Sequence, residues 1–389
     1  MWQWLFLSWL NPLLEAGSTT ALQDEMLPNL LPADTPEANA LEAKVVWEAE
    51  LQAHSPGGLV DLEEAKASGA SLWMVLFRMY RGMFFLSGFL TLLNLAATFA
   101  PPLLLNALLK YIEHEDGQDQ GVAYGYTLAA LMCVLQFATG LLNNHSNVIM
   151  VRLGTRSRAA LTTLVYGKTL KLSQAARAEF SHGQIKNMMQ IDAGRLANSS
   201  GLLHATWSTP LTFGICLWML YAQIGPAAFS GIGVIILLAP CNGLVMKYIF
   251  QFTRAIQTNR DKRVKLLGEV LSGIKIVKSL GWEPELKTQV DASREAEMQE
   301  IGNFQYLIVC IQLLWSICPT LISVSSFAIY TLLDNELTAA KAFTALSLFN
   351  ILTGPVQVMP MVVMAISEVS VSMERIRSFM LAEEAIPEP

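Results

Sequence analysis

The sequence predicts an all-α membrane protein built around six long helices. Hydrophobic residues make up 53% of the 389 residues and charged residues only 15%, well below the roughly 25% of an average soluble domain. A membrane-spanning helix needs about 20 apolar residues to cross about 30 Å of hydrocarbon. Six segments meet that requirement, at about 72–112, 122–171, 186–222, 226–270, 291–333 and 338–380. Several continue far beyond it with the same helical pattern, which indicates helices that project into water.

The first 70 residues differ from the rest, because they hold eleven acidic side chains and only two basic ones. Residues 1–14 carry three tryptophans within nine residues and no basic start, which favours a short helix lying in the membrane interface over a signal peptide. Residues 15–70 read as an acidic cytoplasmic linker that is largely an extended arm. A short amphipathic helix is predicted within it at about 37–53, with an apolar side formed by Leu41, Val45, Trp47 and Leu51.

The connections between the six helices carry unequal charge. Residues 152–187 hold seven basic side chains and one acidic one, and residues 247–294 hold ten and five. The opposite connections, at 113–121, 223–226 and 333–337, contain no Lys or Arg. The positive-inside rule therefore predicts that the two long basic connections are cytoplasmic. With six crossings both termini are cytoplasmic too, residues 71–380 form the membrane domain, and residues 381–389 are a link beyond it.

Motifs for catalysis and for metal or nucleotide binding are missing from the sequence. It contains no phosphate-binding loop, no H-E-x-x-H and no G-x-S-x-G. The five cysteines lie in apolar stretches without a C-x-x-C pair, which favours small buried hydrophobes over a zinc site or disulfides. No catalytic residue, metal site or nucleic-acid partner is predicted, and a membrane-embedded enzyme is the least favoured class.

Each inner connection contains one candidate docking element. In the first, Phe180 to Asp192 can be a short helix that docks onto a soluble partner or a solvated turn between two long helices. In the second, Trp282 stands in a polar, basic stretch, where its ring needs an apolar surface and its N–H a partner. Another protein can supply both, and so can the hairpin itself.

Polar and aromatic residues recur at the predicted membrane level. Because polar groups that face lipid are costly, they are expected to face other helices or a wet cavity. An interhelical hydrogen bond is the expected role for each one singly. The residues concerned include Thr91, Asn94, Gln136, His204, Trp207, Trp218, Gln312, Trp315, Phe349, Asn350 and Gln357.

Five stretches together resemble one protein family. They are Ser8-Trp-Leu-Asn-Pro-Leu-Leu14, Gly183-Gln-Ile with Asp192, Trp207-Ser-Thr-Pro-Leu211, the run from Asp261 to Glu283, and Ser347-Leu-Phe-Asn350 with Val371-Ser-Met-Glu-Arg-Ile376. In order and spacing the chain resembles the first transmembrane domain of the multidrug-resistance-associated proteins, the C subfamily of ATP-binding-cassette (ABC) exporters. The resemblance implies a type 1 six-helix exporter domain with long intracellular helical hairpins, in which residues 1–14 are an interfacial elbow helix.

The resemblance also implies roles for individual residues. Coupling helices near 176–187 and 276–287 would transmit motion from nucleotide-binding domains, through Phe180, Gly183, Gln184, Trp282 and Glu283. Apart from the resemblance, helical spacing predicts charge pairs among Asp261, Arg263, Lys265 and Glu269 that would stiffen the second hairpin, and Asp192 is assigned to the same structural charge network. The substrate cavity would be lined by Thr91, Asn94, Gln136, Trp218, Gln312, Trp315 and Phe349. Thr91 and Asn94 are neutral where anion exporters of the family carry basic residues, so a small amphipathic solute is expected.

Two functions follow from this resemblance as alternatives. In the first, the chain is the translocation path of an ATP-driven exporter in the plasma membrane or a vacuolar-type membrane. ATP and Mg²⁺ would then bind on partner nucleotide-binding domains, and a second six-helix half would complete the path. In the second, the chain is a truncated, non-transporting membrane subunit that docks to another transporter and regulates it. No ATPase is expected on these 389 residues alone.

Overall fold

A computed structural model describes residues 10–23, 26–27, 29–54, 69–113 and 121–385 of the chain. Almost all of this part is helical, and its one β-bridge joins Leu172 to Glu384. The helices are α2 (Asn11–Thr19), η3 (Pro32–Asp34), α3 (Pro36–Ala53), α5 (Leu72–Ile112), α6 (Val122–Lys171), α7 (Gln174–Glu179), α8 (His182–Asn187), η4 (Met188–Asp192), α9 (Ala193–Ser199), η5 (Ser200–Leu202), α10 (Ala205–Ile224), η6 (Gly225–Ala228), α11 (Phe229–Ser272), α12 (Ile274–Leu280), α13 (Glu283–Leu332) and α14 (Ala339–Met380). The elbow helix predicted at 1–14 lies mostly outside the described residues.

The apolar segments match the all-α membrane prediction. Within the described residues, five stretches are long and apolar enough to cross a membrane. One of them, His182–Ser272, contains both α10 and α11, which are separated by the 3-10 turn η6, so it holds two of the six predicted segments. The other four are α5, α6, α13 and α14.

The third predicted segment, 186–222, is not one continuous helix. It is divided into α8, the single π-helical turn η4, α9, the 3-10 turn η5 and α10. Side-chain hydrogen bonds lie at two of these breaks. The side chain of Asp192, at the end of η4, is bound by Ser372 of α14, and the Ser200 hydroxyl donates to the carbonyl of Ala197, a bond that competes with regular helix geometry.

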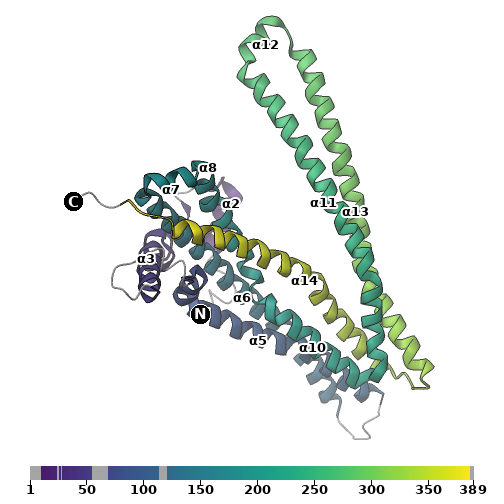
Figure 1. Ribbon diagram of the computed structural model, residues 1–389. Coiled ribbons are helices and arrows are strands. Elements are labelled where there is room, and N and C mark those ends of the chain that lie inside the picture. The colour runs from purple at the N-terminus through teal and green to yellow at the C-terminus, as the bar shows by residue number, and fades with distance from the viewer. Residues whose placement is uncertain (1–9, 24–25, 28, 55–68, 114–120, 386–389) are drawn as a thin grey trace. The chain divides into compact units, whose positions relative to one another are not determined.

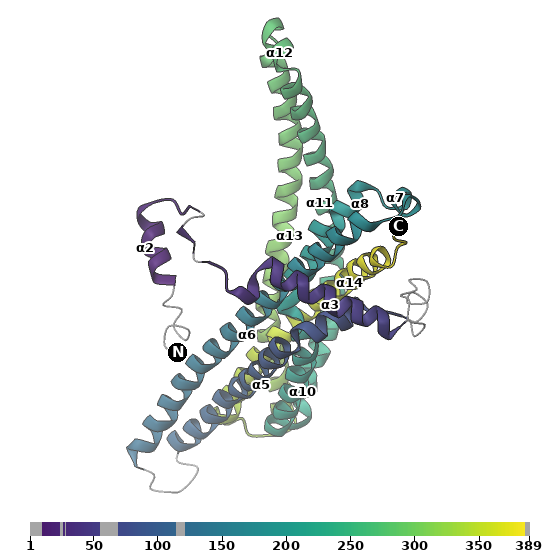
Figure 2. The ribbon, with the colours of Figure 1, turned by 90° about the vertical axis from the view of Figure 1, so that its left-hand side faces the viewer.

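The chain forms two structural units. Unit 1 combines Met1–Phe213 with Pro355–Pro389, and unit 2 is Gly214–Gly354. In unit 1, α3 packs against α5 and α6 (Figure 2), so the linker contains a helix at the predicted place. Its buried side carries Asn39, Ala43, Trp47, Glu50 and Leu51, so Trp47 and Leu51 are buried as predicted.

Leu41 and Val45, which were expected on the apolar side of this helix, are exposed. The reason is that the two polar residues of the buried side have partners on α5. The Tyr80 hydroxyl donates to Asn39 at 2.9 Å, and Glu50 pairs with Arg78 at 2.6 Å. Polar groups with hydrogen-bond partners can be buried at little net cost. The face of α3 that carries Asn39 and Glu50 therefore packs against α5 and α6.

Residues from both ends of the chain build the core of unit 1. Val369, Met373, Ile376 and Phe379 of α14 lie in one hydrophobic cluster with side chains of α3, α5, α6 and α8. A close approach of α6 to α9 requires glycine at position 154. A Cβ there would lie 2.4 Å from the Ser200 hydroxyl and 2.7 Å from the Ala197 carbonyl oxygen.

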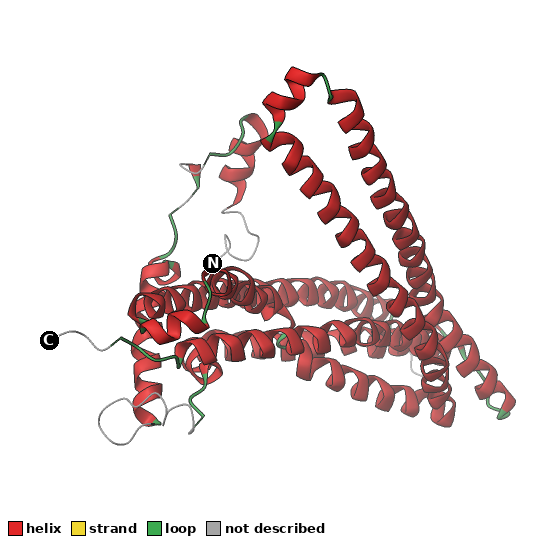
Figure 3. Ribbon diagram, turned by 45° about the horizontal axis from the view of Figure 1, so that its top comes forward, coloured by secondary structure: helices red, strands yellow, loops and turns green. Residues whose placement is uncertain are grey.

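Unit 2 is dominated by the antiparallel pair α11 and α13, which are joined at one end by α12 (Figures 1 and 3). Its packed end contains Phe349, which is fully buried and meets Phe327 edge to face. The hydroxyls of Ser230 and Ser326 lie 2.7 Å apart and join α11 to α13. The long hairpin predicted between the fourth and fifth segments is thus present.

Candidate functional site

The first inner hairpin is formed by α7, α8 and η4 in unit 1. Ser181 begins α8 with a capping box, in which the Gln184 amide donates to the Ser181 hydroxyl and the Ser181 amide donates to the Gln184 side chain. Ile185 is buried in the core, whereas Gly183 and Gln184 are exposed. The hairpin is therefore anchored on one side and presents Gly183 and Gln184 on the other.

Phe180, the third residue predicted to couple at this hairpin, points inward. Its ring meets Phe379 of α14 edge to face, with the ring centroids 5.2 Å apart. Such aromatic pairs contribute about 0.5–1.5 kcal/mol beyond the burial of their area. In this structure Phe180 fastens the hairpin to α14, so any coupling role would act through that contact.

Asp192 also ties the first hairpin to α14. Its carboxylate is nearly buried and accepts a hydrogen bond from Ser372 at 2.8 Å. Arg195 lies 3.5 Å and Arg375 3.8 Å from the same oxygen. A buried carboxylate is tolerated only with such partners, and here they come from two helices far apart in the sequence.

The segment that leaves α14 is held by the end of α6. The Lys168 ammonium, whose side chain is only 2% exposed, lies 2.9 Å from the Glu384 carboxylate. The Ser173 amide donates to the Glu383 carbonyl, and the Ala385 amide donates to the Lys171 carbonyl at 2.7 Å. We call residues 381–385 together with these partners on α6 and α7 the exit latch. Sequence reasoning missed it, because its two sides lie more than 200 residues apart.

The second inner hairpin carries the exposed tryptophan. Gly281 ends α12 in the left-handed conformation, with φ of 65°, which glycine adopts without a steric penalty. Trp282 follows it and is 55% exposed, and Glu283 pairs with Lys278 at 3.0 Å. More than half of the Trp282 surface is thus exposed within unit 2, and the residue lies at the tip of the hairpin beside the ion pair.

An ion cluster braces the two long arms behind this tip. The carboxylate of Glu297 on α13 is fully buried and lies 3.2 Å from Arg260, 2.7 Å from Arg263 and 3.1 Å from Arg294. Arg260 and Arg263 come from α11, so the cluster bridges both arms. At about 1.5 Å per residue it lies roughly 15–20 Å from α12.

Of the four residues predicted to form charge pairs in this hairpin, Arg263 alone forms a salt bridge among the described residues, and its partner is Glu297. Asp261, Lys265 and Glu269 are exposed, and none of them has a salt bridge to another described residue. Glu297, Arg260 and Arg294 were not predicted. The spacing of Arg260 and Arg263 on one helix face, with Arg294 and Glu297 three residues apart, is the signal that could have identified them.

At the membrane level, unit 1 contains a polar network between three helices. The hydroxyls of Thr91 and Ser146 lie 2.9 Å apart, and His204 lies 2.7 Å from the Ser87 hydroxyl. The Trp207 N–H donates to Nδ1 of His204 at 3.1 Å. Nδ1 therefore accepts, and the neutral ring carries its hydrogen on Nε2, which can donate to Ser87. Thr91 and His204 thus make interhelical hydrogen bonds, as predicted.

The other residues predicted for the substrate cavity divide between the units. In unit 1, Gln136 is exposed, and the side-chain oxygen of Asn94 is shielded without a hydrogen-bond partner among the described residues. In unit 2, Trp218 is 71% exposed, and Trp315 and Gln312 are exposed as well. Phe349, by contrast, packs inside unit 2. The cavity role of all seven residues stays a prediction.

Comparison with known proteins agrees with this architecture. Residues 84–356 match the family of the ABC transporter transmembrane region. The chain is 32% identical over 311 residues to human ATP-binding cassette sub-family C member 2, covering 79% of this chain and 20% of that protein. It is 30% identical over 379 residues to ABC transporter C family member 8 of Dictyostelium discoideum, covering 97% and 23%.

These similarities cover most of the chain but only about a fifth to a quarter of the length of each relative. The family match includes both inner hairpins and the apolar helices except for the start of α5 and the second half of α14. The chain belongs to the family of ABC transporter transmembrane regions, and it is a transmembrane domain of the C-subfamily, multidrug-resistance-associated type.

Proposed function

We propose that this chain forms one half of the solute path of an ATP-driven exporter and carries the levers that couple this path to ATP hydrolysis. Two features support the proposal. Each inner hairpin ends in a short helix with exposed residues at its outer surface, and each is braced by buried ions behind that surface. A braced arm with an exposed tip transmits displacement instead of absorbing it.

The partners follow from this role. Nucleotide-binding domains would receive Gly183 and Gln184 at one hairpin and Trp282 with Glu283 at the other, and would bind ATP and Mg²⁺. A second six-helix half would complete the path for a small amphipathic solute, with the exposed Trp218 and Trp315 as part of its wall. Both hairpins would be cytoplasmic, in agreement with their excess of basic residues, and with six crossings both termini would be cytoplasmic too.

Transport would then depend on a difference in solute affinity between two states. Closure of the nucleotide-binding domains on ATP would draw the two hairpins together, and the path would change from inward-open to outward-open. A solute can bias that change only by binding one state more tightly than the other.

The test is purification of the tagged chain with its ATPase partner. The chain is isolated in mild detergent from its own cells, and bound polypeptides with a phosphate-binding loop are quantified together with Mg·ATP hydrolysis. Because buried interface tryptophans often contribute 2 kcal/mol or more, Trp282→Ala should reduce the bound ATPase at least about tenfold. Trp73→Ala, at an exposed tryptophan of α5, is the matched control and should change nothing.

A preparation that contains no such ATPase, and does not consume ATP in proteoliposomes, would contradict the proposal. It would favour the alternative of a non-transporting subunit. The reading frame downstream of the codon for Pro389 gives an independent check, because an exporter of this type should encode a phosphate-binding loop there or in a neighbouring gene.

A further inference from the structure

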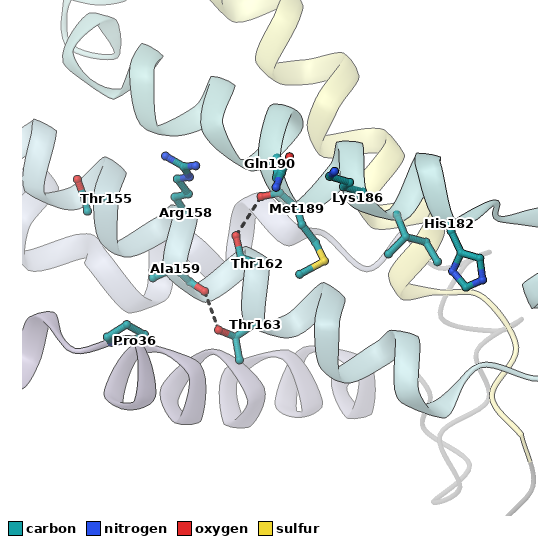
Figure 4. A pocket seen from close by; sticks show the side chains of 11 residues that line it. Pro36, Thr155, Arg158, Ala159, Thr162, Thr163, His182, Lys186, Met189 and Gln190 are labelled. Atoms are coloured by element: carbon teal, nitrogen blue, oxygen red, sulfur yellow. Dashed lines mark hydrogen bonds between the residues drawn. The ribbon is translucent and has the colours of Figure 1, made fainter. Parts of the chain in front are cut away.

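Unit 1 contains a cavity that none of the roles above uses. Its volume is about 630 Å³, and it lies between α6 on one side and α8 with η4 on the other, with Pro36 of α3 at its edge (Figure 4). Cavities of about 300–1,000 Å³ are the usual size of small-molecule sites. The cavity is thus large enough for a ligand of nucleotide or sugar-phosphate size.

The charge of this cavity is one-sided. None of the eleven described residues that line it is acidic, whereas Arg158, Lys186 and His182 are basic. Figure 4 shows Arg158 on α6 and Lys186 on the opposing segment. In the described part of the chain neither of these two cations lies within 4.0 Å of a carboxylate. Arg158 and Lys186 thus give the cavity two positive charges that no described carboxylate pairs with.

The two arginines that precede Arg158 on α6 differ from it, because both have a carboxylate partner. Arg152 and Arg156 both bind the carboxylate of Asp34 from the linker. Burial raises the pKa of Asp34, but the hydrogen bonds and charges of the two arginines outweigh it and hold that pKa below its usual value. This stretch of α6 therefore already binds one anionic group of the protein itself. Two residues further on, Arg158 has no carboxylate within 4.0 Å in the described part of the chain.

The remaining lining fits a ligand that is both anionic and compact. The Gln190 amide adds further donors, and the hydroxyl of Thr162, which donates to the Met189 carbonyl at 3.2 Å, can still accept a hydrogen bond. Met189 and Ile185 supply an apolar wall for a ring. Arginine binds phosphate in a bidentate manner, and lysine adds a point charge, so two separated cations suit two phosphate groups.

The position along α6 also matters. Residues 122–151 contain no Asp, Glu, Lys or Arg and span about 45 Å as a helix, close to the full thickness of a bilayer with its headgroups. Arg158 lies six residues beyond Arg152, or about 9 Å further. At this level the cavity can be reached from water, and also by a lipid headgroup that carries phosphates on a projecting ring.

We propose that this cavity is a binding site for a small ring-based ligand with two or three phosphate groups, of the inositol phosphate class. The ligand would bridge Arg158 on α6 and Lys186 on α8, and so hold the first inner hairpin against α6. The site does not depend on the proposed transport function, because it requires neither ATP nor a partner domain. The same chemistry occurs free in water and on the headgroup of a phosphoinositide lipid.

The experiment measures binding to the whole purified chain in phosphatidylcholine nanodiscs at 150 mM salt. One arm titrates free inositol 1,4,5-trisphosphate. A second arm compares nanodiscs with 5% phosphatidylinositol 4,5-bisphosphate against nanodiscs with phosphatidylserine of equal total charge, and follows thermal stability and hydrogen exchange of α8. Saturable binding in the first arm identifies a free ligand, and a response confined to phosphoinositide nanodiscs identifies a lipid headgroup. Either result supports the site.

Variants decide whether binding occurs in this cavity. Arg158→Gln and Lys186→Gln should each weaken the response at least tenfold without changing the stability of the ligand-free chain, because neither side chain forms an ion pair with another described residue. Arg177→Gln, at an exposed basic residue of α7 outside the cavity, is the matched control and should leave the response unchanged. The proposal is overturned if neither arm responds, if phosphatidylserine responds equally, or if the control variant loses as much as the two cavity variants.

Discussion

Removal of the charge on Glu384 should open the exit latch. In Glu384→Gln the new side chain keeps nearly the same shape and can still accept a hydrogen bond from Lys168. The buried ammonium, with a side chain only 2% exposed, loses its counter-charge. We expect the segment after α14 to detach locally from the end of α6, while the rest of unit 1 stays folded.

The magnitude follows from the burial of the two groups. Removal of one partner of a fully buried ion pair costs about 3–5 kcal/mol, whereas an exposed pair contributes about 0–1 kcal/mol. Lys168 is buried, but Glu384 is 38% exposed, so a value between these limits, of about 2 kcal/mol, is expected. This corresponds to a roughly 30-fold shift of the local opening equilibrium.

Hydrogen exchange of two amides reports this opening directly. The Ser173 amide donates to the Glu383 carbonyl and the Ala385 amide to the Lys171 carbonyl, and both bonds break when the latch opens. When closing is fast relative to exchange, both amides should exchange about 30-fold faster in the variant. Unchanged exchange at both amides would refute the assignment of the ion pair as the element that holds the segment.

Two further variants control this measurement. Glu383→Gln makes the same chemical change at the adjacent, exposed carboxylate, whose one hydrogen bond within the described residues comes from the Ser173 hydroxyl at 3.1 Å, so exchange should rise less than about threefold. The double change Lys168→Met with Glu384→Gln removes both charges. Because a buried pair can often be replaced by apolar groups without loss, it should recover much of the protection. Failure to recover would indicate that the backbone bonds, not the buried charge, determine the opening.

Three other predictions test the braces of the two units. In Glu297→Gln the three arginines of the ion cluster lose the carboxylate that they share. The distribution of distances between spin labels placed on α11 and α13 near α12 should therefore broaden. An unchanged distribution would contradict the proposal that the cluster holds the two helices together. Gly154→Ala places a methyl group 2.7 Å from the Ala197 carbonyl oxygen; overpacking of this kind costs about 1–3 kcal/mol, so the midpoint of thermal unfolding should fall. The arginines that lower the pKa of Asp34 make its contribution to stability complete above the ordinary pKa of 3.8 and lost only at lower pH. Tryptophan fluorescence of α3 should therefore be constant from pH 8 to pH 5 in wild type, and Asp34→Asn should reproduce the acid state at pH 7.

The long helices could be predicted because their cause is contained in the local sequence. The segments predicted at 72–112 and 122–171 coincide with α5 and α6, since an uninterrupted apolar stretch in a membrane must satisfy its own backbone bonds as a helix. The hairpin between α11 and α13 could also be predicted, because the length of its two segments and their excess of basic residues are properties of the local sequence. Its tip residue Trp282 could be singled out because a tryptophan in a basic stretch conflicts with its surroundings.

The features that could not be predicted depend on partners far away in the sequence. The Glu297 cluster joins two helices across 34 and 37 residues, and the exit latch joins residues 216 apart. In α3, hydrophobicity alone predicted that Leu41 and Val45 would be buried. The side that is buried instead includes Asn39, which accepts a hydrogen bond from Tyr80. A single sequence shows which groups need a partner, and it does not show which partner they find.

The origin of the core of unit 1 has a consequence for folding during synthesis. Part of that core, from Val369 to Leu381, is translated long after the residues near Ala193 and Leu196 that it covers. At about 5–20 residues per second, the delay is roughly 10–40 s. For that time α8 and the end of α6 must keep apolar surface uncovered. A ribosome that stalls in α14 before Val369 would therefore leave a membrane-inserted chain in which the core of unit 1 is incomplete.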